Sequence, residues 1–250
     1  MSDYYTPMRS KNIYNPHDQK PFKLSRSKID LFLECPRCFY LDRRLGVGRP
    51  PGFPFTLNSA VDTLLKQEFD IHRASGTPHP LIVQYKIDAR PVPHDDLQRW
   101  RHNFTGVQYI HTPTNLLIFG AIDDLWQNSK SEYIVVDYKA TSINEKITEL
   151  NREYHKGYKR QMEIYQWLLR RNGLTVSDTG YFVYCNGQKD REAFDGKLEF
   201  EVTLIPYEGN DTWVEQTIID AHTCLCSDQV PEAAEDCDYC NYRDAAASVL

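Results

Sequence analysis

An aspartate and a lysine lie two positions apart at the end of a hydrophobic segment. In the stretch EYIVVDYKAT, residues 132–141, Asp137 and Lys139 follow a run of residues that favour β-strands. Side chains alternate between the two faces of a strand, so residues i and i+2 project to the same side. We therefore expect a carboxylate and an ammonium group to act together at the end of this strand.

A second stretch places carboxylates beside the first. LLIFGAIDDLW, residues 116–126, carries Gly120, Asp123 and Asp124 near its end, and the short turn SKS precedes residues 132–141. The spacing predicts two adjacent antiparallel strands, which would bring Asp123 close to Asp137. Two carboxylates this close are costly unless a cation lies between them, and their hard oxygens favour Mg²⁺ or Mn²⁺.

Such a metal would suit phosphodiester hydrolysis. It would lower the pKa of a bound water and stabilise the charged phosphate. Lys139 would orient that water or offset the developing charge. The Asp-x-Lys pattern alone is common, however, and by itself favours an exposed ion pair at the end of a strand. The paired strand with Asp123 is what favours the metal site.

The cysteines suggest a second site. The chain has seven cysteines, and four of them form two C-x-x-C pairs, CPRC at residues 35–38 and CDYC at residues 237–240. Four thiolates are enough for a tetrahedral Zn²⁺ ion or a [4Fe–4S] cluster. Such a site would join the N- and C-terminal regions. We expect Cys185 to be a buried free thiol. Cys224 and Cys226 are expected to be buried free thiols as well, although either is an alternative to Cys38 as a ligand.

Composition excludes some classes of protein. The chain has 250 residues, a formal net charge of -6 and no apolar run long enough to span a membrane. The polar N-terminus lacks the apolar stretch of a signal peptide, so we expect a cytoplasmic protein with no membrane association. Residues 1–50 hold ten basic and five acidic side chains, whereas residues 190–250 hold three basic and fifteen acidic ones. The basic region could contact phosphates, but charge alone favours solvated surfaces.

Helices and strands must position these groups. The patterns predict a loose arm over residues 1–22 and a single domain over residues 23–250, with a metal-binding segment over residues 224–250. Pro36 is expected to bend the first helix. The C-terminal tail is expected to be an irregular loop followed by a short turn. The expected helices span residues 25–46, 56–76, 145–172 and 210–226, and the expected strands span residues 106–112, 115–128, 132–141, 178–187 and 197–207.

The order of these motifs resembles the RecB-like branch of the PD-(D/E)XK nuclease superfamily. GAIDDLW, YIVVDYKATS and RQMEIYQWLL occur in the order found in that branch. The resemblance implies an α/β fold with a mixed central sheet flanked by helices, the restriction-endonuclease-like core. It implies that Asp123 and Asp137 hold the metal, that Lys139 is catalytic and that the Tyr138 carbonyl adds a ligand. The remaining implied residues, Gln161 and Tyr165, would support the site and contact DNA.

The upstream helices also resemble the family, with departures. LNSAVDTLLKQEFD carries Asp62 where a histidine is common, and an aspartate is a competent ligand for the metal. Asp62 could instead mark a weakened nuclease, or lie on the polar flank of its helix. The Cys sites resemble iron–sulfur members, including helicase-nucleases and CRISPR adaptation nucleases. Cys35, Cys237 and Cys240 match their ligands, Ala246 replaces the last cysteine, and Cys38 would supply the fourth thiolate.

Three functions are compatible with these residues. The favoured one is a metal-dependent DNase, acting as an exonuclease on single strands or duplex ends, with protein partners from DNA repair, phage or CRISPR contexts. The second is a weakened or inactive nuclease fold that binds nucleic acid or serves in assembly. The third is an unrelated zinc-stabilised hydrolase that uses Asp123 and Asp124 as acid and base. Adjacent strand residues face opposite sides, so the third ranks last.

Overall fold

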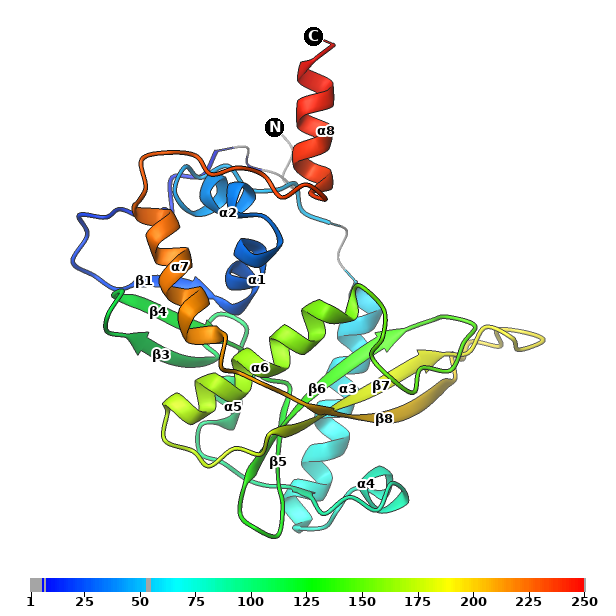
Figure 1. The fold of residues 1–250 in the computed structure, drawn as a ribbon. Helices are drawn as coiled ribbons and strands as arrows, with labels where there is room; N and C mark the ends of the chain where they lie inside the picture. Colours follow the sequence, from blue (N-terminus) through cyan, green and yellow to red (C-terminus); the bar gives the residue numbers. More distant parts are fainter. Residues whose placement is uncertain (1–5, 7, 53–54, 250) are drawn as a thin grey trace. The chain divides into compact units, whose positions relative to one another are not determined.

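The computed structural model describes residues 6, 8–52 and 55–249. Contacts divide the chain into two compact units (Figure 1). The first unit comprises residues 1–53, 108–119 and 212–250, and the second comprises residues 54–107 and 120–211. Part of the expected N-terminal arm, residues 1–5 and 7, lies outside the described residues. That residues 23–250 fold as a single domain stays a prediction.

The first unit combines a small sheet with four helices. Its sheet has the strand order β1-β4-β3, and β1 runs parallel to β4 with Leu24 opposite Ile118. These two side chains are fully buried, together with Ile29 and Ile218 from the helices. The strands are β1 (Phe22–Ser25), β3 (Val107–His111) and β4 (Leu116–Gly120). The helices are α1 (Arg26–Glu34), α2 (Pro36–Arg43), α7 (Val214–Cys226) and α8 (Asp238–Ala247).

Both ends of this unit carry a cysteine at a helix boundary. The expected first helix divides into α1 and α2, with extended backbone at Cys35 and Pro36 at the start of α2. Pro36 therefore interrupts the helix as predicted. The expected short turn near the C-terminus is wrong, because the structure has the ten-residue helix α8 there. Asp238 lies at its positive N-terminal end and its last residues are alanines, both of which favour a helix.

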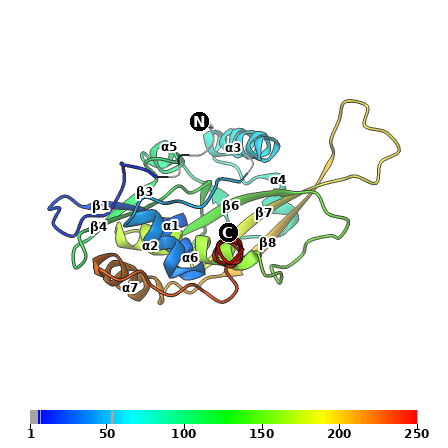
Figure 2. The same ribbon diagram turned by 90° about the horizontal axis from the view of Figure 1, so that it is seen from above.

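The second unit is built on a five-stranded mixed sheet. The strand order is β2-β5-β6-β7-β8, in which β6 and β7 are parallel and the other neighbours are antiparallel. Helices α3 and α6 lie on opposite faces of this sheet (Figures 1 and 2). The strands are β2 (Arg90–Pro91), β5 (Asp124–Gln127), β6 (Tyr133–Thr141), β7 (Thr179–Gly187) and β8 (Phe200–Glu208). The helices are α3 (Thr56–Ser75), α4 (Pro80–Gln84), α5 (Leu97–Trp100) and α6 (His155–Arg171).

The core of the second unit fixes the direction of β6. Val136 and Tyr138 pack toward α3, where Phe69 stacks on the Tyr138 ring with 5.7 Å between the ring centroids. Because side chains alternate along a strand, Asp137 and Lys139 project to the opposite face, under α6. The predicted mixed sheet flanked by helices is confirmed, and so is the predicted antiparallel pairing of β5 with β6.

Two expected elements differ from the structure. The strand expected over residues 115–128 is interrupted, so that β4 and β5 belong to different sheets. Gly106, with φ +58°, approaches the backbone of Gly120 so closely that a Cβ would lie 2.4 Å from its carbonyl oxygen. The chain then turns at Ile122, whose N–H donates to the Trp100 carbonyl. The helix expected from residue 145 begins only at His155, because residues 145–154 form an irregular segment that buries Ile147 and Leu150.

In the helix expected over residues 210–226, the sequence pattern predicts that Trp213, Ile218 and Ile219 face inward, which is right in part. Ile218 is fully buried, whereas Ile219 is exposed and Trp213, just before α7, is half-buried. Two apolar neighbours on a helix point about 100° apart, so only one of them faces the core directly. Across the helices that the structure describes, none is long and apolar enough to cross a membrane.

Candidate active site

Gln161 links the two charged groups of β6. Asp137 is fully buried, and the Gln161 Nε2–H of α6 donates to its Oδ1 at 2.7 Å. The Gln161 Oε1 accepts a hydrogen bond from the Lys139 Nζ at 3.3 Å, and Lys139 forms an ion pair with Asp137. A single amide therefore holds the carboxylate and the ammonium in fixed positions. This is the grouping that the sequence predicts for Asp137 and Lys139.

Aromatic side chains of α6 complete the surroundings of Lys139. Its Nζ lies 4.6 Å from the centre of the Tyr158 ring, and the Tyr165 hydroxyl accepts a hydrogen bond from Gln161 at 3.0 Å. Burial disfavours the charged form of Lys139, but the carboxylates of Asp137 and Asp123 outweigh it and raise the pKa. Lys139 therefore stays cationic in the neutral range.

Asp123 lies in the bend that precedes β5 and reaches toward β6. The backbone N–H of Tyr138 donates to the Asp123 Oδ2 at 2.9 Å. The other oxygen, Oδ1, lies 3.3 Å from the Lys66 Nζ. Pairing of β5 with β6 therefore places Asp123 beside the residue that follows Asp137, as expected from the sequence. The role of the Tyr138 carbonyl as a ligand stays a prediction.

Asp62 and Lys66 bring α3 into the same site. The Lys66 Nζ donates to the Asp62 Oδ2 at 2.8 Å, one helical turn away. Burial and the nearby Asp123 carboxylate raise the pKa of Asp62, although Lys66 opposes this shift. Lys66 was not singled out in the sequence. Its i,i+4 spacing from Asp62 on a helix is the signal that could have identified it.

Asp124 has a different environment from its neighbour Asp123. Its side chain is completely buried and forms ion pairs with Arg73 and Arg101, the latter at 2.8 Å. The Tyr138 hydroxyl donates to its other oxygen at 2.8 Å. A carboxylate already held by two guanidinium groups is a structural anchor. This environment gives no support to a hydrolase that uses Asp123 and Asp124 as acid and base.

The chemistry of the donor set fits a hard divalent cation. Asp62, Asp123 and Asp137 offer carboxylate oxygens, the ligands that Mg²⁺ and Mn²⁺ prefer. In this structure the ammonium groups of Lys66 and Lys139 offset part of the negative charge of these three carboxylates. Within the described residues, the only group of three or more ligand side chains whose donor atoms all lie within 4.8 Å of one another is made of cysteines.

That group is the predicted set of four cysteines in the first unit. Three of the Sγ–Sγ distances are 3.5 Å for Cys38–Cys237, 3.7 Å for Cys38–Cys240 and 3.9 Å for Cys35–Cys240. All four thiols are buried and none forms a disulfide. Burial raises the pKa of Cys35, but hydrogen bonds from the backbone of Ala234 and Cys38 outweigh it and lower the pKa to about 7. Four clustered thiols with one already acidified suit a tetrahedral metal site.

The remaining cysteines lie elsewhere. Cys226 contacts the Tyr14 hydroxyl at 3.2 Å and the His222 Nε2 at 3.5 Å, and it is not part of the four-cysteine group. The four-cysteine group includes Cys38 and neither Cys224 nor Cys226, so the structure gives no support to the alternative in which one of them replaces Cys38. Cys185 is buried in β7, as expected, and burial raises the pKa of its thiol to about 11. The expected burial of the other two thiols is wrong, because Cys224 is half-buried and Cys226 is exposed.

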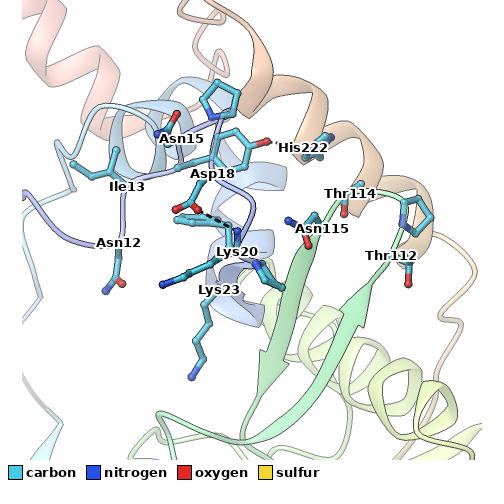
Figure 3. Close-up of a pocket in the computed structure, with 15 residues that line it drawn as sticks. Asn12, Ile13, Asn15, Asp18, Lys20, Lys23, Thr112, Thr114, Asn115 and His222 are labelled. Atoms are coloured by element: carbon cyan, nitrogen blue, oxygen red, sulfur yellow. Dashed lines mark hydrogen bonds between the residues drawn. The ribbon is translucent and has the colours of Figure 1, made fainter.

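The first unit also contains a polar cavity that the sequence did not indicate. Its volume is about 420 Å³, and segments 12–23 and 112–115 line it together with His222 (Figure 3). The Tyr14 hydroxyl and the His222 Nε2 lie 3.0 Å apart in its wall. The cavity contains none of the residues that were singled out for catalysis or for the cysteine site.

Comparison with known proteins identifies the family. Residues 57–245 match the family model of the PD-(D/E)XK nuclease superfamily. This match covers more than half of the chain, and the chain belongs to that superfamily. No curated protein matches it. Among solved structures, the crystal structure of SSO0001 is similar over 94% of this chain and 90% of that chain, with 14% sequence identity and a TM-score of 0.37.

Proposed function

We propose that the chain is a metal-dependent deoxyribonuclease of the RecB-like branch, which hydrolyses phosphodiester bonds as an exonuclease at single strands or duplex ends. The observation that carries this proposal is the bridge formed by Gln161 between Asp137 and Lys139. It assembles a buried carboxylate and a cation next to Asp123, which the Tyr138 backbone holds in place.

Each residue has a defined part in this proposal. Asp123 and Asp137 would hold Mg²⁺ or Mn²⁺, with Asp62 and the Tyr138 carbonyl as further ligands. The bound cation supplies Lewis acidity and lowers the pKa of water. Lys139 offsets the negative charge that develops on the phosphate. The two supporting residues are Gln161, which orients Asp137 and Lys139, and Tyr165, which orients Gln161.

The alternative of an inactive binding module is not favoured. A decayed site loses the contacts that serve catalysis alone, whereas here Asp137, Lys139 and Gln161 remain joined by hydrogen bonds and an ion pair. Membership of a nuclease superfamily agrees with this. Burial of Lys139 against a carboxylate is also costly, and catalysis gives a reason to keep it.

The four cysteines are proposed to hold a [4Fe–4S] cluster, with Zn²⁺ as the alternative. The ligands lie at the junction of α1 with α2 and at the start of α8. A metal there would tie together segments about two hundred residues apart and restrain the unfolded chain. Free clustered thiols suit a reducing compartment, which supports a cytoplasmic location. Partners in DNA repair, phage or CRISPR contexts follow from the family resemblance alone.

Cleavage of labelled DNA tests the proposed activity. Protein purified without oxygen is incubated with Mn²⁺ and with end-labelled single-stranded or duplex DNA, beside a Lys139→Ala variant. We expect the wild type to shorten the DNA from an end, producing small products early, and the variant to leave it intact. Internal fragments without early small products would contradict exonuclease action. Equal degradation by both proteins would contradict the assigned site.

A further inference from the structure

Lys66 is held between two carboxylates that come from different elements. Its Nζ lies 2.8 Å from the Asp62 Oδ2 on α3 and 3.3 Å from the Asp123 Oδ1 before β5. The side chains of Lys66 and Asp123 are each 21% exposed, and that of Asp62 is 33% exposed. The ammonium group is therefore largely removed from water, and it contacts one of the two carboxylates that the proposed function assigns to the metal.

The contacts of Asp123 decide which side chain has to move when a metal binds. The second oxygen of Asp123 accepts the Tyr138 backbone N–H at 2.9 Å. Asp123 cannot rotate away from Lys66 without breaking that bond. Lys66, in contrast, lies on a long flexible side chain, and Asp62 remains as an acceptor one turn away on the same helix. Lys66 can therefore leave Asp123 and keep a charged partner.

We propose that Lys66 acts as a built-in competing cation, which must leave Asp123 before a divalent metal binds and which thereby sets the metal affinity of the site. The inference rests on the proposed function of Asp123 and Asp137 as metal ligands. Lys139 differs from Lys66, because it pairs with Asp137 and is held there by a hydrogen bond to Gln161 and by contact with the Tyr158 ring. Asp62 then serves as the residue that receives Lys66 after displacement.

Removal of the ammonium group should tighten metal binding. In the Lys66→Gln variant, Mn²⁺ no longer has to displace an ammonium group from Asp123. The carboxylates of Asp62 and Asp123 then repel each other without a cation near them, and Mn²⁺ binding relieves this repulsion. We expect the Kd for Mn²⁺ to fall roughly 2- to 5-fold, the upper part of the range that corresponds to loss of one partly exposed ion pair. Mn²⁺ is a suitable probe because it prefers carboxylate oxygens to the thiolates of the cysteine site.

The experiment is a calorimetric titration of Mn²⁺ into the full chain with its cysteine site loaded. Wild type is compared with Lys66→Gln and with Lys130→Gln, a matched control that removes an exposed lysine in the turn before β6. The control should change the Kd by less than about 2-fold, because a distant exposed charge is screened. Lys66→Met is the second variant, with the same expected tightening, in case Lys66→Gln does not fold.

The outcomes separate this inference from the proposed function. Tighter binding by the Lys66 variants, without a change in the control, supports the competition. Equal or weaker binding by the Lys66 variants overturns it and leaves the nuclease proposal intact. Absence of Mn²⁺ binding in wild type and in both Lys66 variants overturns the inference together with the metal-dependent mechanism. DNA cleavage measured on the same preparations then shows whether any nuclease activity remains.

Discussion

The carboxylates of Asp123 and Asp124 are adjacent in the chain but lie in opposite environments. Asp123 is partly exposed and accepts the Tyr138 backbone N–H at 2.9 Å. Asp124 is completely buried and pairs with Arg73 and Arg101. Since side chains alternate at the start of β5, the first carboxylate faces the proposed active site and the second faces the core. We therefore expect Asp123 to serve the proposed chemistry and Asp124 to stabilise the fold.

Substitution of each aspartate should separate the two roles. Asp124→Asn leaves the two buried guanidinium groups with only the partly exposed carboxylate of Asp70 as a charged partner. The free energy of unfolding should therefore fall by about 3 kcal/mol, the lower end of the range for breaking a buried ion pair. Asp123→Asn removes a partly exposed charge, and its stability should stay within about 1 kcal/mol of wild type while DNA cleavage is lost. Urea unfolding and a cleavage assay measure both. An Asp123→Asn protein that still cleaves DNA would contradict the assignment.

Gln161 should matter for rate more than for stability. Gln161→Leu breaks the bridge between Asp137 and Lys139, and misplacement of these groups should slow cleavage about 100-fold. Gln166→Leu is a matched control on the same helix, because its amide donates to the backbone carbonyls of Ser177 and Asp178 rather than to Asp137. The control should lose stability and keep its cleavage rate per folded molecule. Equal loss of rate in both variants would show that Gln161 acts through the general integrity of α6.

The cysteine site should lose its metal when one of its four ligands is removed. Wild type is expected to contain about four iron atoms or one zinc ion per chain. Cys38→Ser should lower this content and the melting temperature, whereas Cys226→Ser should change neither, because Cys226 lies outside the group. Elemental analysis gives the content. A visible absorption band that bleaches on reduction identifies iron–sulfur, since Zn²⁺ has no redox chemistry. Full metal content in Cys38→Ser would contradict the ligand set.

Asp70 should make part of the stability dependent on pH. Burial raises its pKa, but hydrogen bonds from Arg101 and Arg73 outweigh this and lower the pKa below the ordinary value. Because the pKa of Asp70 is lower in the folded state than in the unfolded state, its charged form stabilises the protein at pH values above the unfolded pKa of about 3.9. This stabilisation is lost as the pH falls through the folded-state pKa.

The Asp70→Asn variant tests this dependence. At pH 7 it should be less stable than wild type by about 1 kcal/mol, a figure reduced for the partial exposure of Asp70. The difference should shrink below about pH 4, where wild type begins to protonate Asp70. Urea unfolding at both pH values measures it, with Asp95→Asn as an exposed control that should show no such change. A constant difference at both pH values would contradict the ion-pair explanation.

Gly106 should be more sensitive to substitution than another glycine with positive φ. A Cβ at Gly106 would meet the Gly120 carbonyl oxygen at 2.4 Å, whereas a Cβ at Gly76 would meet nothing within 4 Å. Gly76→Ala therefore carries backbone strain alone, about 1 kcal/mol, and Gly106→Ala should cost about 1–3 kcal/mol more because backbone must move. Thermal or urea unfolding of both variants measures the difference. Equal losses would show that the close approach is unimportant.

The sequence predicted those features that depend on local pattern. Asp137 and Lys139 could be placed on one face because strand alternation is local, and the helix with Gln161 has strong helical periodicity. The break between Gly120 and Asp124 could not be predicted, because the residues on both sides are buried and resemble one continuous strand. The C-terminal helix was missed because the spacing of Cys237 and Cys240 suggested a metal-binding loop.

The contacts that were missed at the site are long-range. Arg73 and Arg101 reach Asp124 from α3 and from the end of α5, and nothing in their own neighbourhoods indicates a shared carboxylate. Lys66 reaches Asp123 in the same way. These partners depend on how α3 and the segment after α5 pack against β5. A family pattern identifies the reacting residues, but the cations that neutralise them follow only from the fold.

The most direct test of the central claim is the single-turnover rate of DNA cleavage with saturating Mn²⁺. Wild type is compared with Lys139→Ala, and the melting temperature and metal content of both proteins are measured on the same preparations. If Asp123, Asp137 and Lys139 form a nuclease site, the variant should keep its metal at the cysteine site and cleave about 100- to 1000-fold more slowly. Cleavage by a folded Lys139→Ala protein at the wild-type rate, or no cleavage by wild type, would contradict the account.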